Sequence, residues 1–252
     1  IHWSQPEILL YDDDPFIRMS YPDLIEEDGQ YFITETQKNV GRVHAIPQPL
    51  LDGLFGQFEN RSVARDGLAL DLPGDQPLPQ TVPMPALPEF HTRDGKQPDY
   101  RGKDMRAGFS LDFRLQLDSL APGQTILDSR DDAGSGILVA TTDTETVRIT
   151  MNDGRQESCW DCDRNLLQPG QLHHVGITVD GGPKIVTFIV DGVLCDGGDL
   201  RQFGWGRFSP TLRAPNGADT LRIAPAVRSL RLYTRALRTS EMAGNYRASA
   251  GQ

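Results

Sequence analysis

Two-residue alternation of apolar and polar side chains is the feature that most restricts how this chain can fold. From Phe109 to Leu117 every second residue is apolar, and the residues between them are polar. This period is typical of a β-strand that buries one face. Six further strand-like runs follow, at 125–127, 136–140, 146–151, 173–179, 184–190 and 226–233.

Short turn sequences separate these runs and indicate antiparallel pairing. Dipeptides such as Pro122–Gly123 and Asp191–Gly192 recur about every 10 to 15 residues and supply positive φ or a preset turn. No amphipathic helices alternate with the strands, which argues against a parallel α/β sheet. We therefore predict an all-β, two-sheet antiparallel sandwich. A short helix capped by Thr239 is expected to close it.

Composition suggests a boundary near residue 60. Residues 1–60 hold 11 acidic and 3 basic residues, against 24 and 22 in 61–252. The early acids are expected to be a solvated surface or, at 12–14 and 26–28, to line a site. The chain is thus divided into a segment 1–60 and a domain 61–252. Seven prolines over 73–104 predict a long irregular loop, either solvated or shaping a binding rim.

The first segment has strand signals of its own. Asp28–Gly29 predicts a hairpin turn, and Leu50–Leu54 a helical turn. Four short strands make about one blade of a β-propeller, which cannot bury both of its faces alone. We therefore expect the segment to need partners outside the sequence, or to lie against the sandwich. The strands are expected at 7–11, 21–26, 30–35 and 41–46.

Charge and hydropathy exclude several partners. A formal net charge of −10 without a Lys/Arg cluster argues against nucleic acid and anionic membrane surfaces. No window approaches 18 uninterrupted apolar residues, which excludes a membrane span. No phosphate loop, nucleophile elbow or zinc-protease motif is present, so no organic cofactor is expected. The start at Ile1, without Met or signal peptide, suggests a processed or truncated piece.

The cysteines and paired histidines have no predicted catalytic role. Cys159 and Cys162 form a C-x-x-C without the second pair that a four-thiolate zinc site needs. Either one of them bridges to Cys195 in an oxidising compartment, or all three stay reduced. His173 and His174 are neighbours on a strand and point to opposite faces, so both are predicted to be structural.

Three motifs in order resemble the laminin-G-like, or concanavalin-A-like, jelly roll. They are the HHV strand at 173–175, the VDG turn at 190–192 and the LRLYTRAL run at 230–237 before the helix. The likeness spans about 61–250 and implies a jelly-roll sandwich. Because this fold hosts sugar binders, protein binders and enzymes, it implies less about function.

The sequence YPDLIEEDGQYFITET at 21–36 resembles the last blade of a sialidase-like glycoside hydrolase propeller. The combination implies the C-terminal part of a secreted or periplasmic enzyme acting on polysaccharides or glycoconjugate glycans. The upstream propeller of the same protein is then an expected partner. Glycosidases use two carboxyl groups roughly 5 to 9.5 Å apart. Asp23 and Glu35 are the candidates, and surface positions are the alternative.

Calcium is the expected cofactor, because modules similar to this one hold it with loop carboxylates. Asp128, Asp131 and Asp132 are close in sequence, and a hard cation takes six to eight oxygens. The alternative is a solvated acidic turn partly neutralised by Arg130.

Sugar binders present aromatic rings beside polar groups. Trp160 and Trp205 are the candidate platforms, and Arg207 could meet a carboxylated or sulfated sugar bidentately. The alternative is that Trp205 fills one end of the core. Three functions stay open: a carbohydrate-recognition module, part of a hydrolase completed by another segment or chain, and a structural or protein-binding module.

Overall fold

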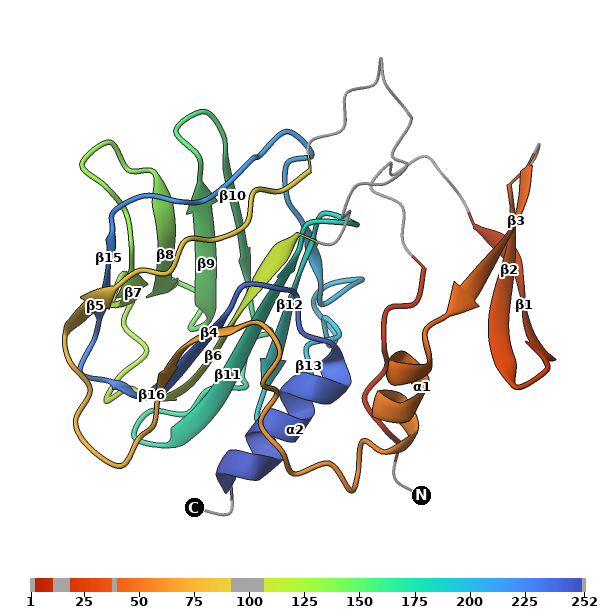
Figure 1. Ribbon diagram of the computed structural model, residues 1–252. Coiled ribbons are helices and arrows are strands. Elements are labelled where there is room, and N and C mark those ends of the chain that lie inside the picture. Colours follow the sequence, from red (N-terminus) through yellow and green to blue (C-terminus); the bar gives the residue numbers. More distant parts are fainter. Residues whose placement is uncertain (1–2, 11–18, 38–39, 92–106, 251–252) are drawn as a thin grey trace.

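A computed structural model describes residues 3–10, 19–37, 40–91 and 107–250. Two antiparallel sheets face each other and form a sandwich (Figure 1). The six-stranded sheet has, in spatial order, β10 (Glu157–Asp161), β9 (Val147–Asn152), β8 (Gly136–Thr141), β7 (Thr125–Asp128), β15 (Thr220–Ile223) and β5 (Thr81–Pro83).

The seven-stranded sheet has its strands in the order β13 (Val193–Leu194), β12 (Ile185–Val190), β11 (Leu172–Asp180), β6 (Gly108–Gln116), β16 (Val227–Tyr233) and β4 (Leu68–Leu72), with β14 (Gly206–Arg207) paired to β12. Every run predicted from alternation in the main domain is a strand. The predicted two-sheet antiparallel sandwich is confirmed.

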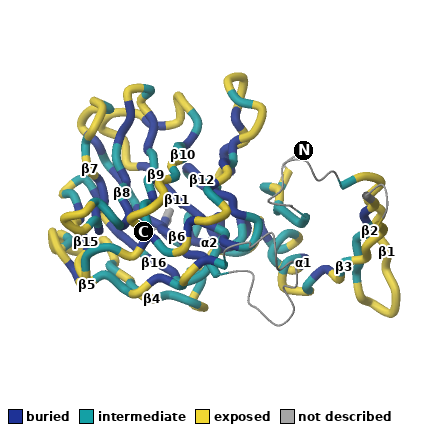
Figure 2. Tube along the Cα trace, turned by 90° about the horizontal axis from the view of Figure 1, so that it is seen from above, coloured by how far each residue is buried: buried dark blue, intermediate teal, exposed yellow. Residues whose placement is uncertain are grey.

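The central strand β6 forms one wall of the core. It pairs with β11 and β16, and its alternation turns Phe109, Leu111 and Phe113 inward, where each is at most 1% exposed. Val139 and Ile149 of the opposite sheet belong to the same buried cluster. Figure 2 shows the buried parts of the chain concentrated between the sheets. Apolar area removed from water contributes about 25 cal/mol per Å², so this layer is the main source of stability.

Helix α2 (Thr239–Ala250) covers the outer face of the seven-stranded sheet (Figure 1). Its Met242 joins a smaller buried cluster with Ile189 and Tyr233. A Cβ on Gly176 of β11 would lie 2.5 Å from Met242 Cγ, so glycine is required for this approach. The structure describes no helix with the length and apolar character of a membrane span.

The N-terminal sheet stands apart from the sandwich in both views (Figures 1 and 2). It contains β1 (Ser20–Glu27), β2 (Gln30–Gln37) and β3 (Val40–Ile46) and leads into α1 (Gln48–Phe55). Asp28 and Gly29 both have positive φ, at 50° and 76°, as the predicted hairpin requires. The acids at 26–28 are exposed.

Of the four strands predicted for this segment, the first, at 7–11, does not form over residues 7–10. Tyr11 and the acids at 12–14 lie outside the described residues. Gln5, just before this segment, contacts the chain after α1. The Gln5 N–H donates to Gln57 Oε1 at 2.7 Å, and Gln57 Nε2 donates back to the Gln5 carbonyl.

Glu7 caps α2 from the other end of the chain. Its carboxylate accepts the N–H groups of Thr239 at 3.1 Å and of Ser240 at 2.8 Å. A carboxylate at a helix N-terminus satisfies free N–H groups and opposes the positive end of the helix dipole. The helix was predicted to be capped by Thr239, but a residue more than 200 positions away does this.

The described part of the proline-rich stretch packs on the sandwich. It contributes β5 at the edge of a sheet, where proline is tolerated, and buries Val82, Leu87 and Phe90. The Phe90 ring lies 5.1 Å from that of Phe208. Residues 73–77 and 79–81 are exposed, as a solvated loop would be, whereas 82–91 contribute side chains to the core, and 92–106 lie outside the described residues.

We expect Glu7→Ala to lower the free energy of unfolding by about 1 kcal/mol, the usual cost of a lost helix cap. Urea denaturation followed by circular dichroism measures the change. Glu59→Ala, which removes an exposed carboxylate of the same kind nearby, serves as the control. Equal stability of the two variants would contradict the capping role.

Candidate functional site

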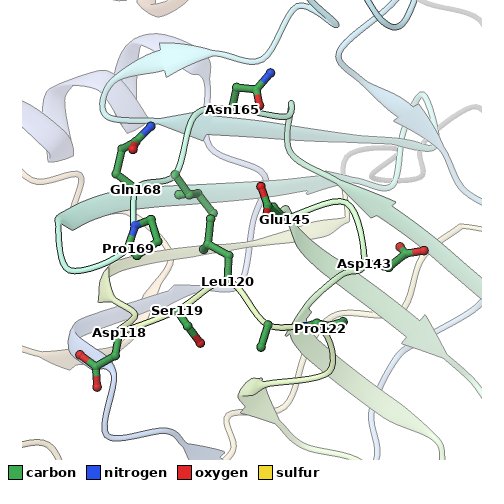
Figure 3. A pocket seen from close by; sticks show the side chains of 11 residues that line it. Asp118, Ser119, Leu120, Pro122, Asp143, Glu145, Asn165, Gln168 and Pro169 are labelled. Carbon is green, nitrogen blue, oxygen red and sulfur yellow. The ribbon is translucent and has the colours of Figure 1, made fainter.

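A pocket of about 400 Å³ opens at one end of the sandwich (Figure 3). Its walls come from the loop 117–124 between β6 and β7, the turn 142–146 between β8 and β9, and the connection 162–171 between β10 and β11. The first and third of these segments carry the chain from one sheet to the other. The pocket therefore lies where both layers contribute side chains.

The lining combines apolar and hydrogen-bonding groups. In Figure 3 Leu120 lies in the middle of the pocket, with Gln168 and Pro169 on one side and Glu145 on the other. The apolar members are Leu120, Ala121, Pro122, Leu167 and Pro169. The polar members are Asp118, Ser119, Asp143, Glu145, Asn165 and Gln168. Six of the eleven lining residues are polar, so the pocket offers a small molecule hydrogen-bonding groups as well as apolar contact.

Hydrogen bonds hold the wall loops in place. Thr141 Oγ1 donates to the Ala121 carbonyl at 2.6 Å, and Gln124 Nε2 donates to the carbonyls of Ser119 and Ala121. The Gly170 N–H donates to the Leu117 carbonyl at 2.7 Å, which joins the two crossing segments. Such loops lose little further freedom when a ligand binds, so the site is preorganised.

Glu145 adopts a backbone conformation that its residue type disfavours. Its φ is +61°, in the left-handed region that costs roughly 1 to 2 kcal/mol for a residue with a Cβ. Asn165, also in the lining, has φ +63°, but asparagine tolerates this region. A turn that needs only to reverse the chain would favour glycine or asparagine at 145. Tyr21 and Lys184 adopt positive φ outside the pocket as well, so what distinguishes Glu145 is that its exposed carboxylate also lines the pocket.

The carboxylates of the pocket have no partners in the described part of the chain. Asp118, Asp143 and Glu145 are exposed, and the structure gives their side chains no hydrogen bond or ion pair. Among the described residues that line the pocket, none is Lys, Arg or His. The oxygens are therefore free to accept hydrogen bonds from a ligand.

Sequence reasoning did not identify this pocket. Its members are separated by up to 51 positions and form no motif. The positive φ of Glu145 could have drawn attention to this turn, but φ is known only from the structure.

The structure places Asp23 and Glu35 on opposite faces of the N-terminal sheet. Asp23 lies directly opposite Thr34, so its side chain shares a face with Thr34, and Glu35 points to the other side. Glu35 is 1% exposed and accepts a hydrogen bond from Arg42 at 2.9 Å. The two carboxyl groups do not face each other in this arrangement, and their catalytic role remains a prediction.

Trp160 on β10 is held in the structure rather than presented as a free platform. Its Nε1 donates to the Gly204 carbonyl at 2.8 Å, and the Arg201 guanidinium lies 4.6 Å from the ring centre. A Cβ on Gly206 would meet the ring, so the ring packs directly on that backbone.

Trp205 and Arg207 lie beside this position, away from the pocket lining. Trp205 is half-buried, with its ring 4.8 Å from that of Phe203, which is 47% exposed. Arg207 is exposed on β14, opposite Ile185. Their predicted contact with a glycan remains a prediction.

The predicted calcium ligands do not fit a calcium ion in this arrangement. Asp128 is bound by Arg130 and by Arg222, each at 2.9 Å. Burial raises the pKa of Asp128, but the hydrogen bonds and charges of these arginines outweigh burial and hold it below its usual value. Asp131 accepts the N–H groups of Ala133 and Ser135 within its own turn.

Asp132, the third predicted ligand, is exposed. Among the described residues no three His, Cys, Asp or Glu side chains are grouped to hold a metal ion. Of the three aspartates, Asp128 is the one that the structure pairs with arginine. Calcium binding remains a prediction from the sequence.

The three cysteines form no disulfide in the structure. Cys162 and Cys195 are buried, and burial raises the pKa of Cys162 to about 12 and raises that of Cys195 as well. Neither is a reactive thiolate at neutral pH. Of the two alternatives, the described arrangement is the reduced one.

Both histidines have structural partners, as predicted. His173 Nε2 accepts the Gln168 N–H at 2.9 Å, so its Nδ1 carries the proton and donates to Asp191 at 2.7 Å. His173 thereby fixes a pocket-lining residue. His174 Nε2 lies 3.2 Å from the buried carboxylate of Asp112.

Asp112 connects α2 to the outer face of the seven-stranded sheet. Asn245 of the helix donates to it, and Arg231 of β16 lies 3.6 Å away. Burial raises the pKa of Asp112, but the charge and hydrogen bond of His174, with Arg231 and Asn245, lower it below its usual value. The seven-stranded sheet therefore contains a buried carboxylate that is stabilised by hydrogen bonds and by Arg231.

Comparisons with known proteins agree with the fold. The family model described as the concanavalin A-like lectin/glucanases superfamily matches residues 95–243. A search of the curated proteins finds no match.

Solved structures similar to this chain include the CBM40 of the Ruminococcus gnavus IT-sialidase bound to α2,3-sialyllactose, with 13% identity, a TM-score of 0.42 and coverage of 65% of this chain and 96% of that chain. Trypanosoma rangeli sialidase has 14% identity, a TM-score of 0.43 and coverage of 92% and 44%.

Acid should destabilise the protein partly through Asp112. Because its pKa is lower in the folded state, its contribution is complete above the unfolded pKa of about 4 and is lost as pH falls through the folded value. Asp112→Asn should cost about 1 to 3 kcal/mol at pH 7, since it removes the buried carboxylate that His174, Asn245 and Arg231 contact. The free energy of unfolding, measured by urea denaturation, should change less between pH 7 and pH 3 in Asp112→Asn than in the control variant Asp132→Asn.

Removal of calcium should leave the melting temperature unchanged, because Asp128 is already matched by two arginines. Calorimetry with chelator and with added calcium measures this, since an ion that binds only the folded form raises the melting temperature. A rise with calcium would instead support the calcium site predicted from the sequence.

Proposed function

The chain belongs to the concanavalin A-like lectin/glucanases superfamily, and from this premise we propose that it is a carbohydrate-recognition module that binds saccharides in the pocket at residues 117–124, 142–146 and 162–171. The observation that carries the proposal is the lining itself. Leu120 and Pro169 offer an apolar floor to the C–H groups of a sugar ring. Unpaired carboxylate and amide oxygens around that floor offer acceptors to its hydroxyl groups.

The strained turn supports the same proposal. Backbone strain persists where the surrounding structure holds it and is concentrated at functional sites. Glu145 combines positive φ, an exposed carboxylate and a position beside Leu120. A role in ligand binding would explain a glutamate at this strained position.

The wider proposal is that this module serves a secreted or periplasmic glycoside hydrolase whose propeller is its partner. Its support is the N-terminal sheet, which leaves apolar side chains uncovered on both faces. Leu24, on one face, is 61% exposed, and Val43, on the other, is 65% exposed. The same observation favours a protein-binding role as the second candidate function.

A glycan panel tests the site. Glu145→Gly removes a ligand acceptor and also relieves the positive φ. We expect affinity for the bound glycan to fall about tenfold, the value of one hydrogen bond to a charged group. Thermal unfolding should show unchanged stability or a gain of up to about 1 kcal/mol. Gln168→Ala should also weaken binding, because it removes a hydrogen-bonding amide from the lining of the pocket.

Trp205→Ala and Arg207→Ala serve as matched controls at the other candidate position and should leave binding unchanged. Loss of binding in these two variants with retention in the pocket variants would move the site to the Trp205 loop. Absence of binding to every glycan would refute carbohydrate recognition and favour the protein-binding role.

A further inference from the structure

The charge of the pocket selects the class of saccharide. We infer, on the basis of the proposed function, that the site accepts neutral and amine-bearing saccharides and rejects carboxylated and sulfated ones. All three ionisable side chains in the lining are acids, namely Asp118, Asp143 and Glu145. The sequence-based expectation that Arg207 meets an acidic sugar points to the opposite class.

The acids remain uncompensated within the described residues. Asp128 elsewhere in the sandwich is bound by two arginines, whereas the pocket carboxylates have no such partner. Their charge therefore acts on a ligand instead of being matched by the protein. The formal net charge of −10 adds a repulsive background for any anion that approaches.

The polar chemistry of the pocket also favours donors on the ligand. A carboxylate only accepts hydrogen bonds, so it pairs with a hydroxyl or an ammonium group and cannot pair with another carboxylate or a sulfate. An anionic saccharide would lose these bonds and add repulsion. An ammonium group would gain a charge-assisted bond. The expected order of affinity is amine-bearing, then neutral, then acidic.

The positions of the three acids in the pocket distinguish their effect on a bound ligand from the repulsion of anions by the whole protein. Figure 3 places Glu145 close to Leu120, with Asp118 and Asp143 nearer the outer edges. A ligand seated on the apolar floor would lie nearest Glu145, while the other two acids affect its approach. Removing charge at 143 and 145 should therefore change both the affinity and its dependence on salt.

The test uses three β-1,4-linked tetrasaccharides of matched backbone: a neutral glucose oligomer, a glucosamine oligomer and a glucuronate oligomer, together with a mixed glycan array. Binding of the full chain is measured at low and high salt. At low salt the acidic ligand should bind at least about tenfold more weakly than the neutral one. High salt should narrow this difference, because it shortens the Debye length from about 10 Å at 0.1 M to about 3 Å at 1 M.

The double variant Asp143→Asn/Glu145→Gln gives a second readout. It should bind acidic glycans at least about fivefold more tightly than the original chain, a gain that misfolding cannot produce. Asp132→Asn, which removes an exposed charge away from the pocket, should have no such effect. Acidic glycans bound as tightly as neutral ones, with loss in Gln168→Ala, would overturn the charge inference and leave the proposed function intact. Binding of no glycan in tetrasaccharide or array form would overturn both.

Discussion

Burial of one side of β6 between the two sheets is the interaction on which the rest of the structure depends. Phe109, Leu111 and Phe113 face the opposite sheet, and the same strand pairs with β11 and β16. Because a shift of one residue would turn every apolar side chain outward, this burial fixes the register of the whole layer. The ends of β6 and β11 then determine where the chain crosses between sheets. The pocket is formed by those crossings, so its position follows from packing far from any ligand.

The opposite side of β6 has a different chemistry and a different consequence. Asp112 points to the outer face, where it contacts His174 of β11, Arg231 of β16 and Asn245 of α2. A buried carboxylate is costly without such partners. Neutral packing by Met242 on Gly176 lies beside this network. Apolar contact therefore brings α2 to the sheet, and the polar network specifies its orientation.

The sequence predicts the long strands well and the site poorly, for a physical reason. Alternation over 109–117 marks the side chains of β6 that face the opposite sheet, although Ser110 and Asp112 on its other face are buried as well. The run at 173–179 is buried on both faces. Strand β10 was missed because Glu157–Asp161 is short, polar and at the edge of its sheet. The pocket depends on three loops that meet only after both sheets have paired. Trp160 was expected to be open to ligand, but the absence of a side chain at Gly206 lets the backbone cover its ring.

The contact of Glu7 with the last helix bears on how the jelly roll can be excised. A fragment that starts at residue 61 includes every strand of both sheets, yet it omits the carboxylate that satisfies the N–H groups of Thr239 and Ser240. It also omits Gln57, whose backbone carbonyl accepts a hydrogen bond from Arg247. Such a fragment would retain both sheets and lose hydrogen bonds that hold its terminal helix. An expression boundary chosen from the strands of the two sheets alone would therefore remove the contact between the N-terminal segment and helix α2.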